Sequence, residues 1–536
     1  MKHIHFSIKR KALLALTPFL LLINGCTKNF PEYNSDTNGI TDEQLKPDFN
    51  SIGAFFPALQ NGIYPSNNGD GIAVDIAFLS QGAWAGYTMG TFPGARNMNY
   101  SLFAGWEPFS MFSVGYNSVM SPVNEIKRKG AETEAPDFWA VALILKVAAM
   151  HGVTDIFGPV PYSKFGLGGT TVEYDSQQKI YDAFFTELDQ AVAALKTYIA
   201  AKPGATPFRK FDLVYKGDYT KWLKYANSLR LRLAMHIVKV DRAKAQLQAE
   251  KAVDMANGGV FTSNADNAFV LGGGLINMLH IATNVWGDVR VGAAIITYMN
   301  GYNDDRIGKY FEPSTVIPGQ YVGIRTGSII ASQSDYLKFS TVSRATYSEE
   351  SAVQLMNAAE VYFLRAEGAL RGWNMGGNTP KELYELGITT SFNQYGVGGA
   401  ASAYIADATS TPAAHTDPIN PANSSPALSS ITIKWDEAAT NEQKLERIIT
   451  QQWIANFANS TEAWTTFRRT GYPKLFPVVE NNSGGLISTS IQIRRMTYLA
   501  SEYTSNAAEV AKAVTLLGGP DNGGTRLWWD IPGGNF

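Results

Sequence analysis

The sequence predicts a mainly helical protein in which paired helices carry a large irregular, loop-rich part. Apolar residues recur with helical periodicity in two parts of the chain, near residues 137–257 and 351–470. Near 50–120 and 260–350 this periodicity gives way to mixtures of Gly, Asn and aromatic residues. A third observation is a short apolar run near the N-terminus, which ends at the single cysteine of the chain, Cys26.

The N-terminal segment has the layout of an export signal. Basic residues precede the apolar run 12–23, which is too short to cross a bilayer as a mature helix. The sequence INGC at 23–26 resembles a bacterial lipobox, so we expect 1–25 to be a lipoprotein signal peptide and Cys26 to be lipidated. Residues 26–40 would then form a polar tether, and 41–536 the folded body. The alternative is a buried free cysteine that follows a core helix.

The first helical part contains four predicted helices. Residues 138–150 are apolar almost all round, which predicts a helix buried on most sides and ending at His151-Gly152. Further helices are expected after Asp175, over 218–238 and over 244–255. Such consecutive pairs, with lengths near those of tetratricopeptide units, predict a right-handed solenoid. After the signal, we expect no segment long and apolar enough to span a membrane.

The second helical part begins at 351–372, where apolar residues form a stripe, and continues near 383–392. Residues 398–431 are dominated by Ala, Ser, Thr and Pro, which predicts a long exposed loop. Another helix is expected from Leu445, and a short one over 506–517. The second helical part therefore also consists of consecutive helices.

Composition limits the class of partner. Loss of residues 1–25 removes four basic residues and no acidic ones, so the formal net charge moves from -2 to -6. A mildly acidic chain argues against nucleic acid as a partner. Aromatic residues make up 12% of the chain and charged residues 17%, which is typical of much packed surface together with aromatic-bearing loops.

Several segments, in order along the whole chain, resemble the SusD/RagB family of outer-membrane nutrient-binding lipoproteins of Bacteroidetes. They are GPVPY at 158–162, KWLKYANSLRLR at 221–232, NAAEVYFLRAE at 357–367, IITQQW at 448–453, EAWTTFRRTGYP at 462–473, RRMTY at 494–498 and WWD at 528–530.

The resemblance implies a fold of four tetratricopeptide-like helix pairs that carry a large irregular part. It also implies a lipid-anchored protein of the outer membrane, facing the cell exterior, that acts as a lid on a SusC-like TonB-dependent transporter. The ligand implied is an oligosaccharide or, less often, a peptide.

Sugars are recognised by flat aromatic rings together with amide and carboxylate groups, because they present both C–H faces and hydroxyls. In the two irregular parts the candidate ligand-binding residues are Trp84, Tyr87, Asn284, Trp286, Tyr302 and Asn303. The alternative for any one of these rings is that it fills the core.

No arrangement for catalysis is convincing in the sequence. HExxH and GxSxG are absent, and His151, His236, His280 and His415 have no metal-like neighbours in sequence, so we predict no metal and no cofactor. The adjacent acids at 304–305 and 349–350 read as solvated loop charges. We therefore expect a non-enzymatic binding lipoprotein. The alternatives are a lipid-anchored glycoside hydrolase and an envelope scaffold without a ligand.

Overall fold

The computed structural model describes residues 47–63, 71–94 and 96–536. The chain separates into two units, Met1–Ser51 and Ile52–Phe536. Of the first unit only its last residues are described: η1 (Pro47–Phe49) and the start of α4 (Asn50–Gly53). The predicted signal peptide, Cys26 and the tether lie outside the described residues. The second unit contains all the other described helices and strands.

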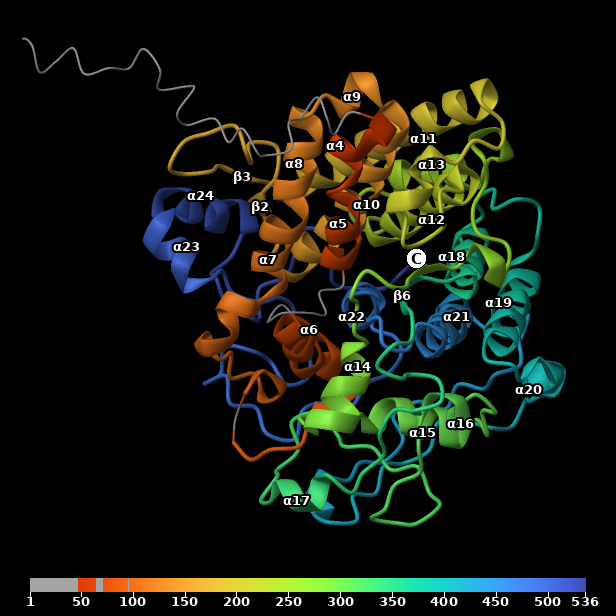
Figure 1. The fold of residues 1–536 in the computed structure, drawn as a ribbon. Coiled ribbons are helices and arrows are strands. Elements are labelled where there is room, and N and C mark those ends of the chain that lie inside the picture. Colours follow the sequence, from red (N-terminus) through yellow and green to blue (C-terminus); the bar gives the residue numbers. More distant parts are fainter. Residues whose placement is uncertain (1–46, 64–70, 95) are drawn as a thin grey trace, which may run out of the picture. The chain divides into compact units, whose positions relative to one another are not determined.

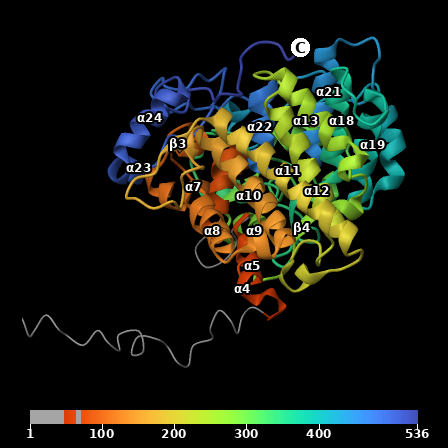
Figure 2. The ribbon, with the colours of Figure 1, turned by 90° about the horizontal axis from the view of Figure 1, so that it is seen from above.

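Eight long helices, which succeed one another in pairs, organise this unit (Figure 1). The chain is mostly helical, which confirms the predicted mainly helical fold class. Figure 2 shows α10 beside α11, α12 beside α13 and α18 beside α19. Contacts of α11 with α12, of α12 with α18 and of α18 with α21 join one pair to the next. The eight helices are α10 (Pro136–Phe157), α11 (Gln177–Ala201), α12 (Tyr219–His236), α13 (Arg242–Val253), α18 (Ala358–Leu370), α19 (Pro380–Gln394), α21 (Asn441–Ala455) and α22 (Ser460–Thr470).

Side-chain caps fix where several of these helices begin. The Asp218 carboxylate accepts the backbone N–H of Thr220 at 2.9 Å and so opens α12. Thr379 and Thr440 each form a capping box, with Glu382 and Gln443 respectively, at the starts of α19 and α21. These caps satisfy backbone donors that have no partner inside the helix.

Helix α10 extends beyond its predicted end at His151-Gly152 and stops only at Gly158, which has a φ of 89°. Gly152 does not break the helix, and the space beside it is taken by Thr461 of α22, whose methyl group would lie 3.6 Å from a Cβ at 152. With 22 residues, α10 is long and apolar enough to cross a membrane, contrary to our expectation for this part of the chain. Of its most apolar stretch of 18 residues, 78% is buried inside the protein, as in a core helix.

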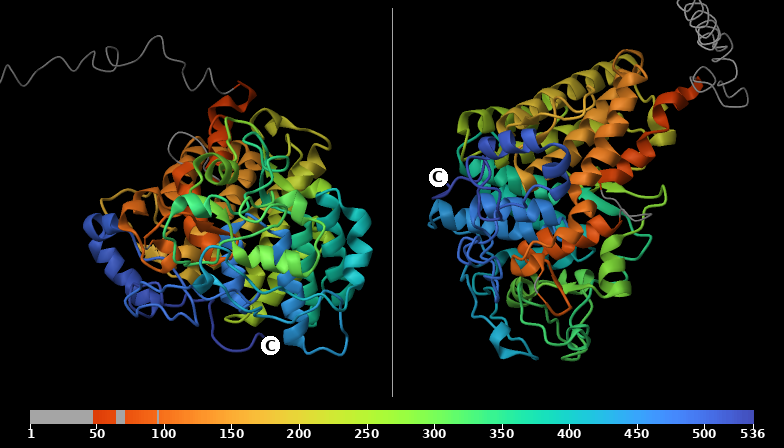
Figure 3. Two further views of the ribbon diagram at one scale, coloured as in Figure 1. Left: turned by 90° about the horizontal axis from the view of Figure 1, so that it is seen from below. Right: turned by 90° about the vertical axis from the view of Figure 1, so that its left-hand side faces the viewer.

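Short helices and three two-stranded antiparallel sheets make up the irregular parts. The segment 260–350 lies to one side of the long helices (Figures 1 and 3). The α-helices are α5 (Phe56–Ile63), α6 (Gly71–Ala77), α7 (Met111–Val114), α8 (Ser121–Arg128), α9 (Ala131–Glu134), α14 (Met278–His280), α15 (Ala293–Gly301), α16 (Ile307–Tyr310), α17 (Gln333–Tyr336), α20 (Ala401–Ala406), α23 (Ala500–Ser505) and α24 (Ala507–Leu517).

The remaining turns are π-helical or 3-10. The π-helical turns are η2 (Phe78–Gly82), η5 (Gly115–Met120) and η9 (Ile281–Trp286). The 3-10 turns are η3 (Asn97–Asn99), η4 (Ala104–Phe109), η6 (Pro207–Phe211), η7 (Met255–Asn257), η8 (Asn264–Asp266), η10 (Gly398–Ala400) and η11 (Pro421–Asn423).

The sheets pair β1 (Thr88–Gly90) with β5 (Val289–Val291), β2 (Val160–Pro161) with β3 (Tyr174–Asp175), and β4 (Ala268–Val270) with β6 (Val353–Met356). The start of the predicted helix 351–372 is therefore wrong, because 353–356 pairs as a strand and α18 begins only at Ala358.

Buried charges join α10, α12, α18 and α22. Arg232 of α12 donates from Nε and Nη2 to the Glu360 carboxylate at 2.6 and 2.7 Å. On the next turn of α12, His236 Nε2 lies 3.0 Å from Glu462 of α22, and its Nδ1 lies 3.3 Å from Asp155 of α10. All five side chains are buried, so each charge depends on its partner in a medium of low dielectric constant.

The protonation of His236 follows from this arrangement. Burial by itself would lower the pKa of the imidazole. The Glu462 carboxylate and the hydrogen bonds to Asp155 and Glu462 outweigh burial and raise the pKa to about 9. His236 is therefore a cation at neutral pH, held between two carboxylates.

A second buried cluster lies between α18 and α22. Arg469 donates two hydrogen bonds to the two oxygens of Glu367, at 2.6 and 2.7 Å, and Arg371 donates to Oε1 at 2.7 Å. Burial would raise the pKa of Glu367, but the two guanidinium groups outweigh it and hold the pKa at about 2. The carboxylate therefore stays ionised at any ordinary pH.

We predict that the protein loses stability between pH 6.5 and pH 9 as His236 loses its proton. The folded-state pKa lies above the unfolded value of 6.5, so this stabilisation is complete below pH 6.5 and is lost as the pH rises through 9. The loss amounts to at most about 3 kcal/mol. Urea unfolding at a series of pH values measures it. His236→Gln should be less stable at pH 6 and show a flatter profile, and an equally steep profile would refute the assignment.

We further predict that Glu367→Ala lowers the free energy of unfolding by about 3–5 kcal/mol, because it leaves Arg469 and Arg371 buried without their carboxylate. The matched control Glu350→Ala removes an exposed carboxylate and should change stability by less than about 0.5 kcal/mol. Denaturant titration of the two variants makes the comparison. Equal stabilities would show that the cluster contributes nothing.

Candidate functional site

The two irregular parts meet at a short antiparallel strand pair. In this pair β1 (Thr88–Gly90) runs beside β5 (Val289–Val291), with Thr88 opposite Val291. Thr91 extends the contact, since its N–H donates to Asp288 O at 3.0 Å and its hydroxyl donates to Gly287 O at 2.7 Å. Gly287 has a φ of 75°, a conformation that favours glycine, and it turns the chain from η9 into β5. Residues just after 90 thus lie next to residues just before 289.

Three of the six predicted ligand-binding residues lie in the core. Trp84, Tyr87 and Tyr302 are buried, and each donates its polar hydrogen to a backbone carbonyl. Trp84 packs on Trp464 with ring centroids 4.8 Å apart, and Tyr87 stacks on Trp453 at 5.3 Å. A ring covered in this way offers no face to a ligand, so these three residues fill the core instead of forming an open platform.

The other three predicted residues differ in their surroundings. Trp286, at the end of η9, exposes 47% of its surface. Asn284 lies on the same turn and donates to Val342 O at 3.2 Å. Asn303 is exposed, but it follows the far end of α15 and donates to Ser410 at 3.4 Å. The structure thus places Asn284 and Trp286 together, and Asn303 apart from them.

Two other exposed apolar residues lie near Trp286: Val285 precedes it, and Leu337 lies against Gly287, where an added Cβ would be 2.9 Å from its Cδ2. We call Val285, Trp286, Asp288 and Leu337 the Trp286 surface; Val285 and Leu337 are also exposed. Arg290 positions Leu337, because its Nε and Nη2 donate to Leu337 O at 3.1 and 3.0 Å. A flat indole beside apolar side chains and a carboxylate is suited to a ligand that has both C–H faces and hydroxyl groups.

Sequence reasoning missed a second group of exposed aromatic residues, on and beside η4. Phe103 and Phe109 are exposed, and Trp106 packs edge-on against Phe103 with centroids 5.6 Å apart. The Arg96 guanidinium lies 4.8 Å from the centroid of the Phe103 ring. The available signal was the Phe-Ala-Gly-Trp-Glu-Pro-Phe run at 103–109, which mixes aromatic residues with Gly and Pro and has no helical period.

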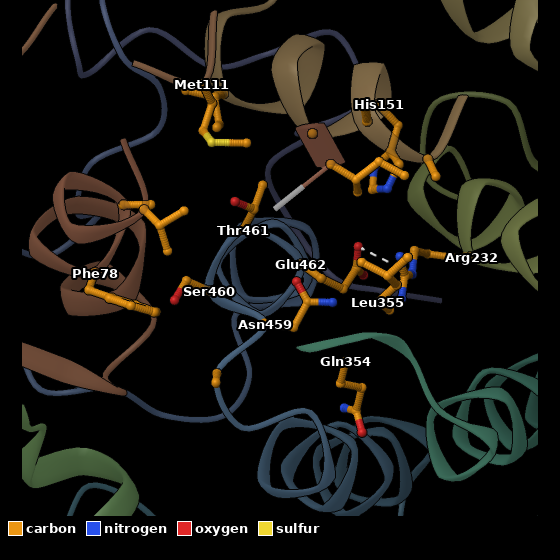
Figure 4. Close-up of a pocket in the computed structure, with 18 of the residues that line it drawn as sticks. Phe78, Met111, His151, Arg232, Gln354, Leu355, Asn459, Ser460, Thr461 and Glu462 are labelled. Atoms are coloured by element: carbon orange, nitrogen blue, oxygen red, sulfur yellow. Dashed lines mark hydrogen bonds and ion pairs between the residues drawn. The ribbon is translucent and has the colours of Figure 1, made fainter. Parts of the chain in front are cut away.

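An interior pocket of about 120 Å³ lies between the long helices and α6 (Figure 4). Figure 4 shows Phe78 and Met111 on one side and Arg232 with Glu462 on the other, where Arg232 Nε lies 3.7 Å from Glu462 Oε2. Other lining residues include His151, Gln354, Asn459, Ser460 and Thr461. The charged end of the pocket consists of groups already bound to one another, and it therefore belongs to the ion network that joins the helices.

Three potential metal ligands meet beside this pocket, which corrects our expectation that these histidines have no metal-like neighbours. The ligand atoms of His151, Asp155 and His236 all lie within 4.8 Å of one another; the first two lie one turn apart on α10 and the third lies on α12. The carboxylates of Glu462 and Asp155 outweigh burial and raise the pKa of His236, so both of its ring nitrogens carry protons at neutral pH. Both of its nitrogens already face carboxylates, so the residues fit an ion network better than a metal site.

The acidic pairs considered for glycoside hydrolysis do not form a catalytic arrangement. Asp304 is buried and accepts Arg306 Nε at 2.9 Å, so its charge is already neutralised. Glu349 and Glu350 are exposed. An enzyme of this class needs two carboxyl groups that flank one bond, one of them free to donate a proton.

Comparison with known proteins reveals relatives over nearly the whole chain. A SusD-like family model, described as Susd and RagB outer membrane lipoprotein, matches residues 32–530. No relative was found among curated protein sequences.

Solved structures of related proteins are similar in both sequence and fold. A chitin-binding SusD homologue from Flavobacterium johnsoniae is 45% identical with a TM-score of 0.87, and the match covers 90% of this chain and 100% of that one. A SusD homologue from Bacteroides vulgatus is 36% identical with a TM-score of 0.85, covering 91% and 99%. One from Bacteroides uniformis is 40% identical with a TM-score of 0.81, covering 90% and 99%.

These matches confirm the resemblance seen in the sequence and the expectation of a protein that is not an enzyme. The chain belongs to the SusD-like family of outer membrane lipoproteins.

Proposed function

We propose that this protein captures an oligosaccharide at the cell surface and presents it, as a lid, to a SusC-like TonB-dependent transporter. The observation that carries the proposal is the Trp286 surface, which groups an indole that is 47% exposed with the exposed residues Val285 and Leu337 and the half-buried Asp288. The chitin-binding homologue, 45% identical, supports a saccharide over a peptide as the ligand.

The proposed site is suited to weak capture. An aromatic ring contributes about 0.5–1.5 kcal/mol beyond the area it buries, so a site with one or two rings implies dissociation constants in the micromolar to millimolar range. Weak binding is sufficient when a transporter removes the ligand, because tight capture would oppose release.

The lipid anchor completes the proposal. A lipidated Cys26 would hold the body at the membrane, since two acyl chains give stable attachment where one does not. A tether over 26–40 would let the body move relative to a membrane partner. Membership of an outer membrane lipoprotein family supports this location, and we infer that the protein faces the cell exterior.

We predict that Trp286→Ala weakens binding of soluble chitin oligosaccharides by about five- to tenfold, because the open indole face is lost. Isothermal titration of the purified protein measures the change. Leu247→Ala, which removes an exposed apolar side chain from α13, is the matched control and should bind as wild type does. If Trp286→Ala and wild type bind equally, the Trp286 surface is not the site.

We also predict that Cys26→Ala abolishes membrane retention and leaves the fold intact. Fractionation of cells shows where the variant goes, and its circular dichroism spectrum should match that of wild type. Wild-type protein extracted from the same membranes should co-purify with a large TonB-dependent barrel. A variant that still sediments with membranes would contradict the anchor, and the absence of any barrel would contradict the partner.

A further inference from the structure

A second groove lies away from the Trp286 surface and shares no lining residue with it. Its cavity of about 290 Å³ is close to the lower end of the range for small-ligand sites, about 300 Å³. In Figure 1 its elements α7, β2, β3 and α23 lie together, apart from α14 and α17. We call it the Tyr116 groove. Its lining residues are Phe112, Ser113, Tyr116, Asn117, Pro161, Phe165, Thr170, Val172, Leu499, Ser501, Glu502, Ser505 and Asn506.

Three aromatic rings form one wall of the groove. Tyr116 is central, with ring centroids 4.8 Å from Phe112 and 5.1 Å from Phe165. The Tyr116 hydroxyl donates to Pro161 O at 2.6 Å, and burial raises its pKa well above the usual value, so it stays neutral. The one polar atom of this wall is already bonded. Phe112 and Tyr116 are buried and support the half-buried Phe165, which is the ring most open to a ligand.

The opposite wall is polar and is held in place by its own hydrogen bonds. Asn506 bonds the backbone of Val172 twice, accepting its N–H at 3.3 Å and donating to its carbonyl at 3.0 Å. Tyr174 donates to Glu502 Oε2 at 2.7 Å and so fixes that carboxylate. The groove therefore has a preformed acceptor, which keeps the cost of ordering low when a ligand binds.

Other polar groups on the lining are open to a ligand. Within the parts of the chain that the structure describes, the side chains of Ser113, Asn117 and Thr170 form no hydrogen bond, and Asn117 and Thr170 are exposed. One amide and two hydroxyls therefore face a site in which a carboxylate oxygen is already oriented.

The charge of the lining selects among ligands. Glu502 is the single carboxylic acid of the lining, and the lining contains no Lys, Arg or His. An anionic ligand would meet a carboxylate without a compensating cation, which is unfavourable at short range. Aromatic rings opposite hydroxyl, amide and carboxylate groups match instead an uncharged ring that carries several hydroxyls.

We propose that the Tyr116 groove binds one uncharged pyranose unit and is a second saccharide site of this protein. It extends the proposed function, because a polymer held at two separate points binds with higher overall avidity than one held at either point. It does not depend on the Trp286 surface, since the two sites have no residue in common.

The test uses full-length protein in detergent with Trp286→Ala as the background, so that only the groove remains. Probes are the tetramers of glucose and of N-acetylglucosamine, and tetragalacturonate as the anion. We expect at least one neutral tetramer to bind and the anion not to bind. Asn117→Ala and Phe165→Ala should each weaken the neutral tetramer by about five- to tenfold in titration calorimetry.

Two variants show whether a loss of binding reflects the groove or a loss of the folded structure. Asn117→Ala removes an exposed amide without a bonded partner. Leu167→Ala is the control, because Leu167 is 73% exposed on the loop that carries Phe165 and does not line the groove. The proposal is overturned if the background binds no tetramer, if Asn117→Ala and Phe165→Ala bind as the background does, or if tetragalacturonate binds as well as the neutral tetramers. If Trp286→Ala alone binds as wild type does and the groove variants lose binding, the Trp286 surface fails and the groove stands.

Discussion

The fold depends on a buried line of charges that crosses four helices. Glu360 of α18 faces Arg232 of α12, and His236, one turn further along α12, is held between Glu462 of α22 and Asp155 of α10. In a low-dielectric interior such charges are stable only together, so a shift of one helix would leave a charge unpaired. Elements from both halves of the sequence are therefore fixed in one register, and the irregular segments are built on that frame.

Much of the helical frame was predictable from apolar spacing, as in α12 and α24, because such spacing is a local property of the chain. The prediction failed where contact with a segment far away in sequence decides the secondary structure. Strand β6 exists because β4 lies beside it, and the sequence near 353 carries no mark of that pairing. Likewise α10 continues past Gly152. Buried acids such as Glu360 and Glu367 were recognisable as ion-pair partners, but the arginines of other helices that they pair with were not, since those lie far away in sequence.

The candidate site was predictable in its segments and less so in its residues. Trp84 and Trp286 both lie close to Gly in segments without helical periodicity, so composition does not distinguish them. Trp84 is covered by Trp464, far along the chain, while Trp286 ends a turn at the surface. Whether a ring faces inward is decided by tertiary packing, which a single sequence does not display.

The position of the Trp286 surface depends on the β1–β5 pair. Its two strands are three residues each and come from positions roughly 200 residues apart, so the pair has little stability of its own and forms only after the intervening chain is in place. A partly folded chain would therefore lack the Trp286 surface, and the ligand capture that we propose would be confined to fully folded molecules. The proposed ligand surface would thus be present only once chain segments that are far apart in sequence have come together.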